Sequence, residues 1–426
     1  MSTTLMSPTD AVTGARERMQ HAKRAARTVG LFTAAQKAEM LNAVADRLEA
    51  DTGVIVEANT ADVDRGRETG LSEALQDRLR LDPARVAALA AAVREVAELP
   101  DPVGRVLEER RLENGLSLTK VAVPFGVVGS IYEARPNVTV DIAALALRSG
   151  NAVVLRGGSA AENSNRALIA SMRAALESVG VDAEAIQTVD DFGRDGARAM
   201  MQARGLIDVL VPRGSAQLIE TVVTESTVPV IETGAGLVHI VLDESARADW
   251  ALDIVVNAKA QRPSVCNAVE TVLVHRGAAD RLVPNLVGAL QAAGVTVHGD
   301  ADVSARAEGV IPATPDDWAT EYLSLDVAIR VVDDLDAALE HIRTYSSQHT
   351  ESIITEDPAA AERFLAEVDS AVVMVNSSTR FTDGGEFGFG AEVGISTQKL
   401  HARGPMGLPE LTSTKWLVRG AGQVRG

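Results

Sequence analysis

The only cysteine of the 426-residue chain, Cys266, lies in a stretch whose pattern could present a thiol to a cleft. A helical pattern ends near Gln261, residues 262–264 (Arg-Pro-Ser) break it, and the apolar run 269–274 is typical of a strand. A cysteine between a helix end and a strand can act as a nucleophile where its surroundings favour the thiolate. The alternative is a buried cysteine that serves only as a small apolar residue, which is the usual role of a free cysteine.

Three glycine-bearing turns follow predicted strands and could together bind an anionic cofactor. They are Arg156-Gly157-Gly158-Ser159 after the run 152–155, Arg213-Gly214-Ser215 after 207–211, and Glu232-Thr233-Gly234 after 228–231. Backbone amides and an arginine at the carboxyl ends of neighbouring parallel strands favour phosphate groups. A tight turn with a surface arginine is the alternative for any one of them, but three at one sheet edge favour a cofactor site. The sequence has no G-x-G-x-x-G motif, so the usual dinucleotide fingerprint is absent.

Basic side chains gather late in the sequence and could hold a dianionic group of a substrate. They are Arg380, Lys399, His401 and Arg403, with Arg135 far upstream. Serine and threonine hydroxyls at 377–379 would add hydrogen-bond donors, although a solvated surface is the alternative. No histidine pair has the spacing of metal ligands, and a single cysteine cannot form a thiolate-rich site, so we predict no metal.

Composition and charge limit the class of protein. The formal net charge of -18 argues against a nucleic-acid-binding protein, which needs a basic surface. Apolar residues make up 46% of the chain and aromatic residues 3%, so a large aliphatic core is expected. Residues 1–9 do not resemble a signal peptide, and no apolar run reaches the ~20 residues that span a bilayer. We therefore expect a cytoplasmic protein that is not bound to a membrane.

The order of predicted elements indicates an α/β protein with two parallel sheets. Amphipathic helices fill the first hundred residues, strands and helices then alternate from Gly126, and a second alternating block begins near Val238. Between the helices and the first block, Asn114-Gly115 joins two strand-like runs, 105–112 and 116–123, as a hairpin. A long polar hairpin of this kind either pairs with another chain or remains a plain surface hairpin.

Four longer stretches resemble a known family. They are Ile131-Tyr-Glu-Ala-Arg-Pro-Asn-Val-Thr-Val-Asp141, Gly150-Asn-Ala-Val-Val-Leu-Arg-Gly-Gly-Ser159, Gln348-His-Thr-Glu-Ser352 and Ser396-Thr-Gln-Lys-Leu-His-Ala-Arg-Gly-Pro-Met-Gly407. From about residue 10 to 420 the chain resembles the γ-glutamyl phosphate reductases, or glutamate-5-semialdehyde dehydrogenases, of the aldehyde dehydrogenase superfamily. The resemblance implies an NADPH-binding domain (1–104 and 124–235), a catalytic domain (236–408) and a β arm for oligomerisation (105–123 and 409–420). The hairpin 105–123 and the strand-like run 412–418 together suggest a homodimer or a homotetramer.

The same resemblance implies the activity and the roles of several residues. Members reduce L-glutamate 5-phosphate to the semialdehyde with NADPH and release phosphate, in proline biosynthesis, and association with glutamate 5-kinase would protect the unstable substrate. Cys266 falls where the superfamily keeps its nucleophile, Glu232–Gly236 resembles the turn beside the nicotinamide, and Glu321 begins a stretch that resembles the one meeting the nicotinamide ribose. A hydrolytic or CoA-acylating relative, a thiol hydrolase and a non-catalytic oligomeric scaffold are the alternatives.

Departures from the family pattern carry further expectations. Where NAD-linked members have Lys-Pro-Ser-Glu, this chain ends the turn in Ser159, and the missing acid favours NADPH because a glutamate would repel a 2′-phosphate. The segment that supplies an oxyanion amide is replaced by residues 134–137, in which Asn137 is the candidate donor. Arg135, Arg380, Lys399 and Arg403 are candidate ligands of the substrate carboxylate or phosphate, with no individual assignment.

Overall fold

The computed structural model describes residues 7–133 and 135–425, apart from the side chain of Ala74. Its contacts divide the chain into two compact units. The first unit comprises Met1–Glu232, Phe389–Gly394 and Met406–Gly426, and the second comprises Thr233–Gly388 and Ile395–Pro405. The predicted regions kept 236–408 together, whereas the chain returns to the first unit at 389–394 and again from 406. Ala134, the first residue of the predicted oxyanion segment, lies outside the described residues.

The first unit contains a series of α-helices. They are α1 (Pro8–Val29), α2 (Ala34–Ala50), α3 (Thr52–Glu68), α4 (Glu73–Leu79), α5 (Pro83–Glu98), α6 (Pro136–Arg148), α7 (Glu162–Ser178), α8 (Gly193–Met201) and α9 (Ala216–Glu225). Thr33 forms a capping box with Gln36 at the start of α2, and Asp82 caps α5 ahead of Pro83. The predicted apolar stripes of α2 and α5 are buried, so these helices contribute to the core.

A parallel sheet forms the centre of the first unit. Among the described residues its order is β5-β4-β3-β6, with β3 (Val127–Tyr132), β4 (Ala152–Arg156), β5 (Ile186–Thr188) and β6 (Val209–Arg213). The predicted strand at 228–231 is wrong as a full strand, because only an isolated bridge joins Leu210 to Val230. The carbonyl of Pro229 accepts a hydrogen bond from the amide of Leu210. Pro229 has no backbone N–H to donate in return, so a continuous ladder cannot form.

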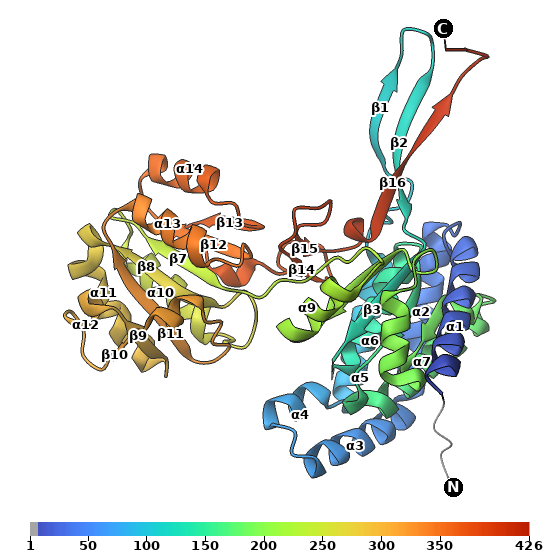
Figure 1. The fold of residues 1–426 in the computed structure, drawn as a ribbon, viewed down its shortest axis with the longest axis horizontal. Helices are drawn as coiled ribbons and strands as arrows, with labels where there is room; N and C mark the ends of the chain where they lie inside the picture. The colour runs from blue at the N-terminus through green and yellow to red at the C-terminus, as the bar shows by residue number, and fades with distance from the viewer. Residues whose placement is uncertain (1–6, 134, 426) are drawn as a thin grey trace. The chain divides into compact units, whose positions relative to one another are not determined.

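An antiparallel sheet of β1 (Val106–Arg111), β2 (Ser117–Pro124) and β16 (Thr412–Arg419) stands out from the helices of the first unit (Figure 1). The predicted hairpin forms, with Glu109 opposite Thr119 and a turn in which Gly115 has a φ of 89°. β16 then pairs with β2 along its whole length, from Thr412 opposite Pro124. The two ends of the predicted arm, far apart in sequence, therefore lie in one sheet.

The second unit is built on a parallel sheet with the order β10-β9-β11-β8-β7-β12-β13 among the described residues. Its strands are β7 (Val238–Leu242), β8 (Val269–His275), β9 (Thr296–Gly299), β10 (Ile311–Pro312), β11 (Asp326–Val332), β12 (Thr350–Ile354) and β13 (Val372–Val375). Its helices are α10 (Ala248–Ala260), α11 (Arg276–Ala292), α12 (Ala301–Ser304), α13 (Leu335–Tyr345) and α14 (Pro358–Glu367). Two aliphatic core clusters, one with α10 and α11 and one with α13 and α14, bury the sheet. A short pair, β14 (Gly394–Ser396) and β15 (Gly404–Met406), completes the strands.

Candidate active site

Cys266 lies in the loop between α10 and β8, as the sequence predicts, and its side chain is neither fully buried nor fully exposed. The neighbouring Asn267 fixes this loop to the segment at 379–382. Its Nδ2 donates to the carbonyl of Thr382 at 2.8 Å, and its own carbonyl accepts from the hydroxyl of Thr379 at 2.8 Å. A thiol that is partly exposed on a loop held at both faces is suited to react with a bound molecule.

Gly236 packs its backbone directly against Cys266. A Cβ at position 236 would lie 1.6 Å from the carbonyl oxygen of Cys266, so only glycine fits. The amide of Gly236 donates to Oε1 of Glu321 at 2.7 Å. Gly234 is similarly tight, because a Cβ there would lie 2.4 Å from Cγ2 of Thr397. The predicted residues Gly234, Glu321 and Cys266 therefore lie in one neighbourhood of the second unit.

The predicted cluster of basic side chains separates into two parts. Arg380 lies near Cys266, and its Nε donates to Oε1 of Gln261 at 3.0 Å. Burial lowers the pKa of Arg380, and the negative charges of Asp383, a Cys266 thiolate and Glu386 oppose that shift. Because this attraction is mutual, Arg380 favours the thiolate. Lys399 and Arg403 instead bind Asp369, whose pKa they lower through hydrogen bonds.

In the first unit, the turn Arg156–Ser159 follows β4 as predicted. The amide of Gly157 donates to Oδ1 of Asp190 at 2.7 Å, and burial raises the pKa of Asp190 to about 6. Arg156 keeps its Nε buried without an acceptor among the described residues. A buried guanidinium nitrogen that lacks an acceptor is suited to an added anionic or hydroxyl group.

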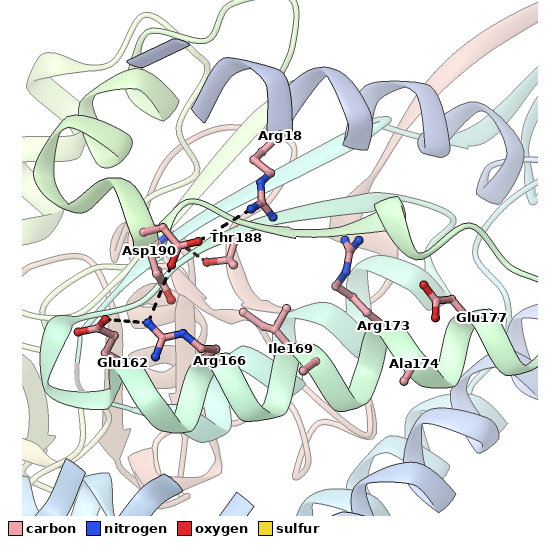
Figure 2. A pocket seen from close by; sticks show the side chains of 11 residues that line it. Arg18, Glu162, Arg166, Ile169, Arg173, Ala174, Glu177, Thr188 and Asp190 are labelled. Carbon is pink, nitrogen blue, oxygen red and sulfur yellow. Dashed lines mark hydrogen bonds and ion pairs between the residues drawn. The ribbon is translucent and has the colours of Figure 1, made fainter. Parts of the chain in front are cut away.

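A cavity of about 360 Å³ lies beside this turn and shares Asp190 with it. Figure 2 shows Arg18 from α1, and Arg166 and Arg173 from α7, among the side chains around it. Arg173 is held by Glu184 at 2.7 Å, whereas Arg18 and Arg166 each lie 3.9 Å from Asp191. Arg166 also pairs with Glu162 at 2.9 Å. The cavity therefore combines arginine donors with an adjoining Gly-Gly turn.

The turn at 213–215 already has an anionic partner. Glu133, which follows β3, accepts from the amide of Ser215 at 2.8 Å and from its hydroxyl at 2.9 Å. This arrangement presents a carboxylate, which suits a ribose hydroxyl better than a phosphate. Nδ2 of Asn137, the candidate oxyanion donor, donates a hydrogen bond to Oδ2 of Asp141 at 3.1 Å. Burial raises the pKa of Asp141 to about 6. Arg135 occupies the N-cap position of α6. Glu232 is the last residue of the long N-terminal segment that belongs to the first unit.

Sequence reasoning missed two buried polar groups near Cys266 in the second unit. Lys259 and Glu270 form an ion pair of 2.6 Å with side chains 0% and 1% exposed. A glutamate inside an apolar strand pattern was the available signal, because such a residue is seldom buried without a partner. His349 is buried, with its Nδ1 2.8 Å from the hydroxyl of Thr350, and burial lowers its pKa to about 4. Among the described residues, no helix is long and apolar enough to cross a membrane, and no cluster of three ligands could hold a metal ion.

Comparisons with known proteins agree with this architecture. The model of the aldehyde dehydrogenase family matches residues 6–307. The chain is 64% identical over 420 residues to the gamma-glutamyl phosphate reductase of Leifsonia xyli subsp. xyli, with 99% of this chain and 100% of the relative covered. It is 58% identical over 417 residues to that of Thermobifida fusca, with 98% and 100% covered.

A solved structure extends this similarity to three dimensions. The gamma-glutamyl phosphate reductase of Thermotoga maritima matches with a TM-score of 0.95 and 44% identity, over 97% of this chain and 100% of that one. Both matches cover nearly the whole chain. The chain therefore belongs to the aldehyde dehydrogenase family and, within it, to the gamma-glutamyl phosphate reductases.

Proposed function

We propose that the protein reduces L-glutamate 5-phosphate to L-glutamate 5-semialdehyde with NADPH, releasing phosphate, as a step of proline biosynthesis. The observation that carries the chemistry is the Cys266 loop, in which a partly exposed thiol lies within the electrostatic influence of the half-buried Arg380. The names of the similar proteins support the substrate, since each is a gamma-glutamyl phosphate reductase. Arg380 supplies the cation that a reactive cysteine needs near neutral pH.

The thiolate of Cys266 attacks the carbonyl carbon of the acyl phosphate. The carbon–oxygen bond to phosphate breaks, phosphate leaves with its electron pair, and a thioester to Cys266 remains. Backbone amides of the Cys266 loop hold the oxyanion, a contribution for which one donor is typically worth ~3–4 kcal/mol in the barrier. Asn137 stays the candidate for a side-chain donor. Because phosphate is a good leaving group, the step needs no dedicated proton donor. Arg380 faces the charge that develops next to the sulfur.

The residues that would hold NADPH are the three glycine turns and Glu321. Arg156, through its unpaired Nε, and the Gly157-Gly158-Ser159 turn would bind the adenosine end, with Arg166 and Arg18 available to the 2′-phosphate. The Glu133 carboxylate at the 213–215 turn suits a ribose hydroxyl. Glu232, Thr233 and Gly234 with Glu321 would lie at the nicotinamide end. When bound, NADPH supplies the hydride that converts the thioester to the aldehyde and restores the thiolate.

A reverse-direction assay tests the reaction as a whole. With glutamate 5-semialdehyde, NADP⁺ and phosphate present, we expect NADPH absorbance to rise, and omission of any one component should abolish the rise. Phosphate is the decisive component, because it must cleave the thioester. NADPH formation without phosphate would indicate a hydrolytic enzyme, and formation that requires CoA instead would indicate a CoA-acylating one. No NADPH under any condition would contradict the proposal.

Substitution of Ser159 by glutamate should move the cofactor preference towards NADH. An added carboxylate would repel the 2′-phosphate, and we expect the ratio of NADPH to NADH affinity to fall by about 10- to 100-fold. Fluorescence titration of both cofactors gives the two dissociation constants without turnover. Ser159→Ala is the matched control and should change the ratio little. An unchanged ratio in Ser159→Glu would remove this turn from the 2′-phosphate site.

We also propose that the sheet of β1, β2 and β16 mediates oligomerisation. Trp416 on β16 is partly exposed between Arg110 and Lys120, each 5.8 Å from its ring, and Val418 is exposed nearby. An exposed edge strand with an aromatic and an aliphatic side chain is suited to pair with a second copy of the chain.

A further inference from the structure

The Cys266 loop is closed at its base by a buried ion pair. Lys259 belongs to the last turn of α10 and Glu270 to the start of β8, so the bond between Nζ and Oε2 joins the two ends of the loop. Burial raises the pKa of Glu270 to about 7, and the charge of Lys259 opposes that shift. A buried ion pair is weak evidence of stabilisation, because desolvation cancels much of the attraction. The pair therefore calls for a role other than stability.

The second carboxylate oxygen of Glu270 contacts a segment outside the Cys266 loop. Its Oε1 accepts from the amide of Leu323 at 3.3 Å. Leu323 has a φ of 55°, a left-handed backbone conformation that is uncommon for residues other than glycine. Its side chain is 43% exposed, so side-chain burial does not account for this conformation. Strained backbone of this kind persists where surrounding contacts over-determine it, and it gathers at functional sites. Here the contact is the Glu270 carboxylate.

The segment that contains Leu323 is also connected to Cys266, through Gly236. Two residues before Leu323, Glu321 accepts from the amide of Gly236, and the backbone of Gly236 lies against the carbonyl of Cys266. The contacts thus form a closed ring, from the Cys266 loop through Lys259 and Glu270 to residues 321–323 and back through Gly236. Every member belongs to the second unit.

On the basis of the function proposed above, we propose that Lys259 and Glu270 are positioning residues, which set the Cys266 loop and Glu321 in register through the Leu323 amide. Neither residue touches the reacting atoms in this role. Glu270 is the central member, because it contacts both Lys259 and Leu323. The Lys259 charge opposes the rise that burial imposes on the pKa of Glu270, so it favours the ionised form that accepts from both groups.

Two neutral double variants separate this role from charge and from general stability. Lys259→Met/Glu270→Gln keeps a carbonyl oxygen for the Leu323 amide, whereas Lys259→Met/Glu270→Met has none. We expect the Gln variant to retain kcat and the rate of Cys266 alkylation by iodoacetamide within about threefold. The Met variant should lose about 10- to 100-fold in kcat, as displacement of reacting groups typically does, with KM for the acyl phosphate changed little and alkylation slowed.

A second buried lysine–carboxylate pair provides the control. Lys37 and Asp101 in the first unit lie 2.9 Å apart, and Lys37 is buried. Lys37→Met/Asp101→Asn should alter thermal stability but leave kcat and Cys266 alkylation unchanged. Wild-type values in the Glu270→Met variant, or equal losses in both Glu270 variants, would overturn the positioning role. Full turnover by a Cys266→Ser variant would instead refute the proposed function, so the two failures are distinguishable.

Discussion

Replacement of Cys266 by serine is expected to lower the rate of glutamate-5-semialdehyde formation by at least ~10³-fold, because a serine hydroxyl is not ionised near neutral pH. The proposed cofactor site uses other residues, so the affinity for NADPH should remain that of the unchanged protein. Turnover followed at the NADPH absorbance, together with fluorescence titration of NADPH, measures both quantities.

Cys266→Ala is the control for the size of the side chain, since it removes the heteroatom without adding bulk. Its turnover should be as low as that of the serine variant, and thermal melting should place both within a few degrees of the original protein. Near-normal turnover in either variant would exclude covalent catalysis by Cys266 and leave a scaffold or a non-covalent reductase.

Substitution of Arg380 by glutamine should lower kcat by about 10²–10³-fold and move the alkylation profile of Cys266 to higher pH. The sign follows from charge: loss of a cation that attracts the thiolate leaves less thiolate at a given pH, so a higher pH is needed to restore it. Iodoacetamide labelling between about pH 6 and 10 measures this profile without substrate. Arg380→Lys keeps the positive charge but loses the planar guanidinium with its several N–H donors. This variant should therefore restore most of the pH profile of alkylation but only part of kcat.

The matched control for Arg380 is Arg363→Gln on α14, whose guanidinium pairs with Glu367 at the surface. It removes the same charge from the same unit, and both the alkylation profile and kcat should be unaffected. A profile in Arg380→Gln that overlies the original would mean that another group favours the thiolate.

Much of the fold was predictable because parallel strands buried on both faces have a strong local signal. The runs at 127–132, 238–242 and 269–275 are rich in apolar residues, and each forms a buried strand. β9 and β10 were missed because they are short and contain polar or proline residues. The run at 228–231 was apolar enough to predict a strand, but Pro229 limits it to a single bridge.

The site was only partly predictable, because ion pairs join residues far apart in sequence. Arg380, Lys399 and Arg403 are close along the chain, yet Asp369 holds two of them and the third lies near Cys266. The Gly-Gly turn at 157–158 could be predicted from the sequence. The hydrogen bond from the amide of Gly157 to the carboxylate of Asp190 could not. Likewise, no local pattern relates Glu133 to Ser215 across more than eighty residues.

The contact between Gly236 and the carbonyl of Cys266 also limits how this protein can change over generations. Each one-base change of a glycine codon is silent, creates a stop, or encodes a residue that has a Cβ. A Cβ at this position would overlap a backbone atom, which cannot rotate out of the way as a side chain could. Position 236 therefore has no tolerated amino-acid replacement within one base change, and lineages can diverge around it only while the glycine is inherited unchanged.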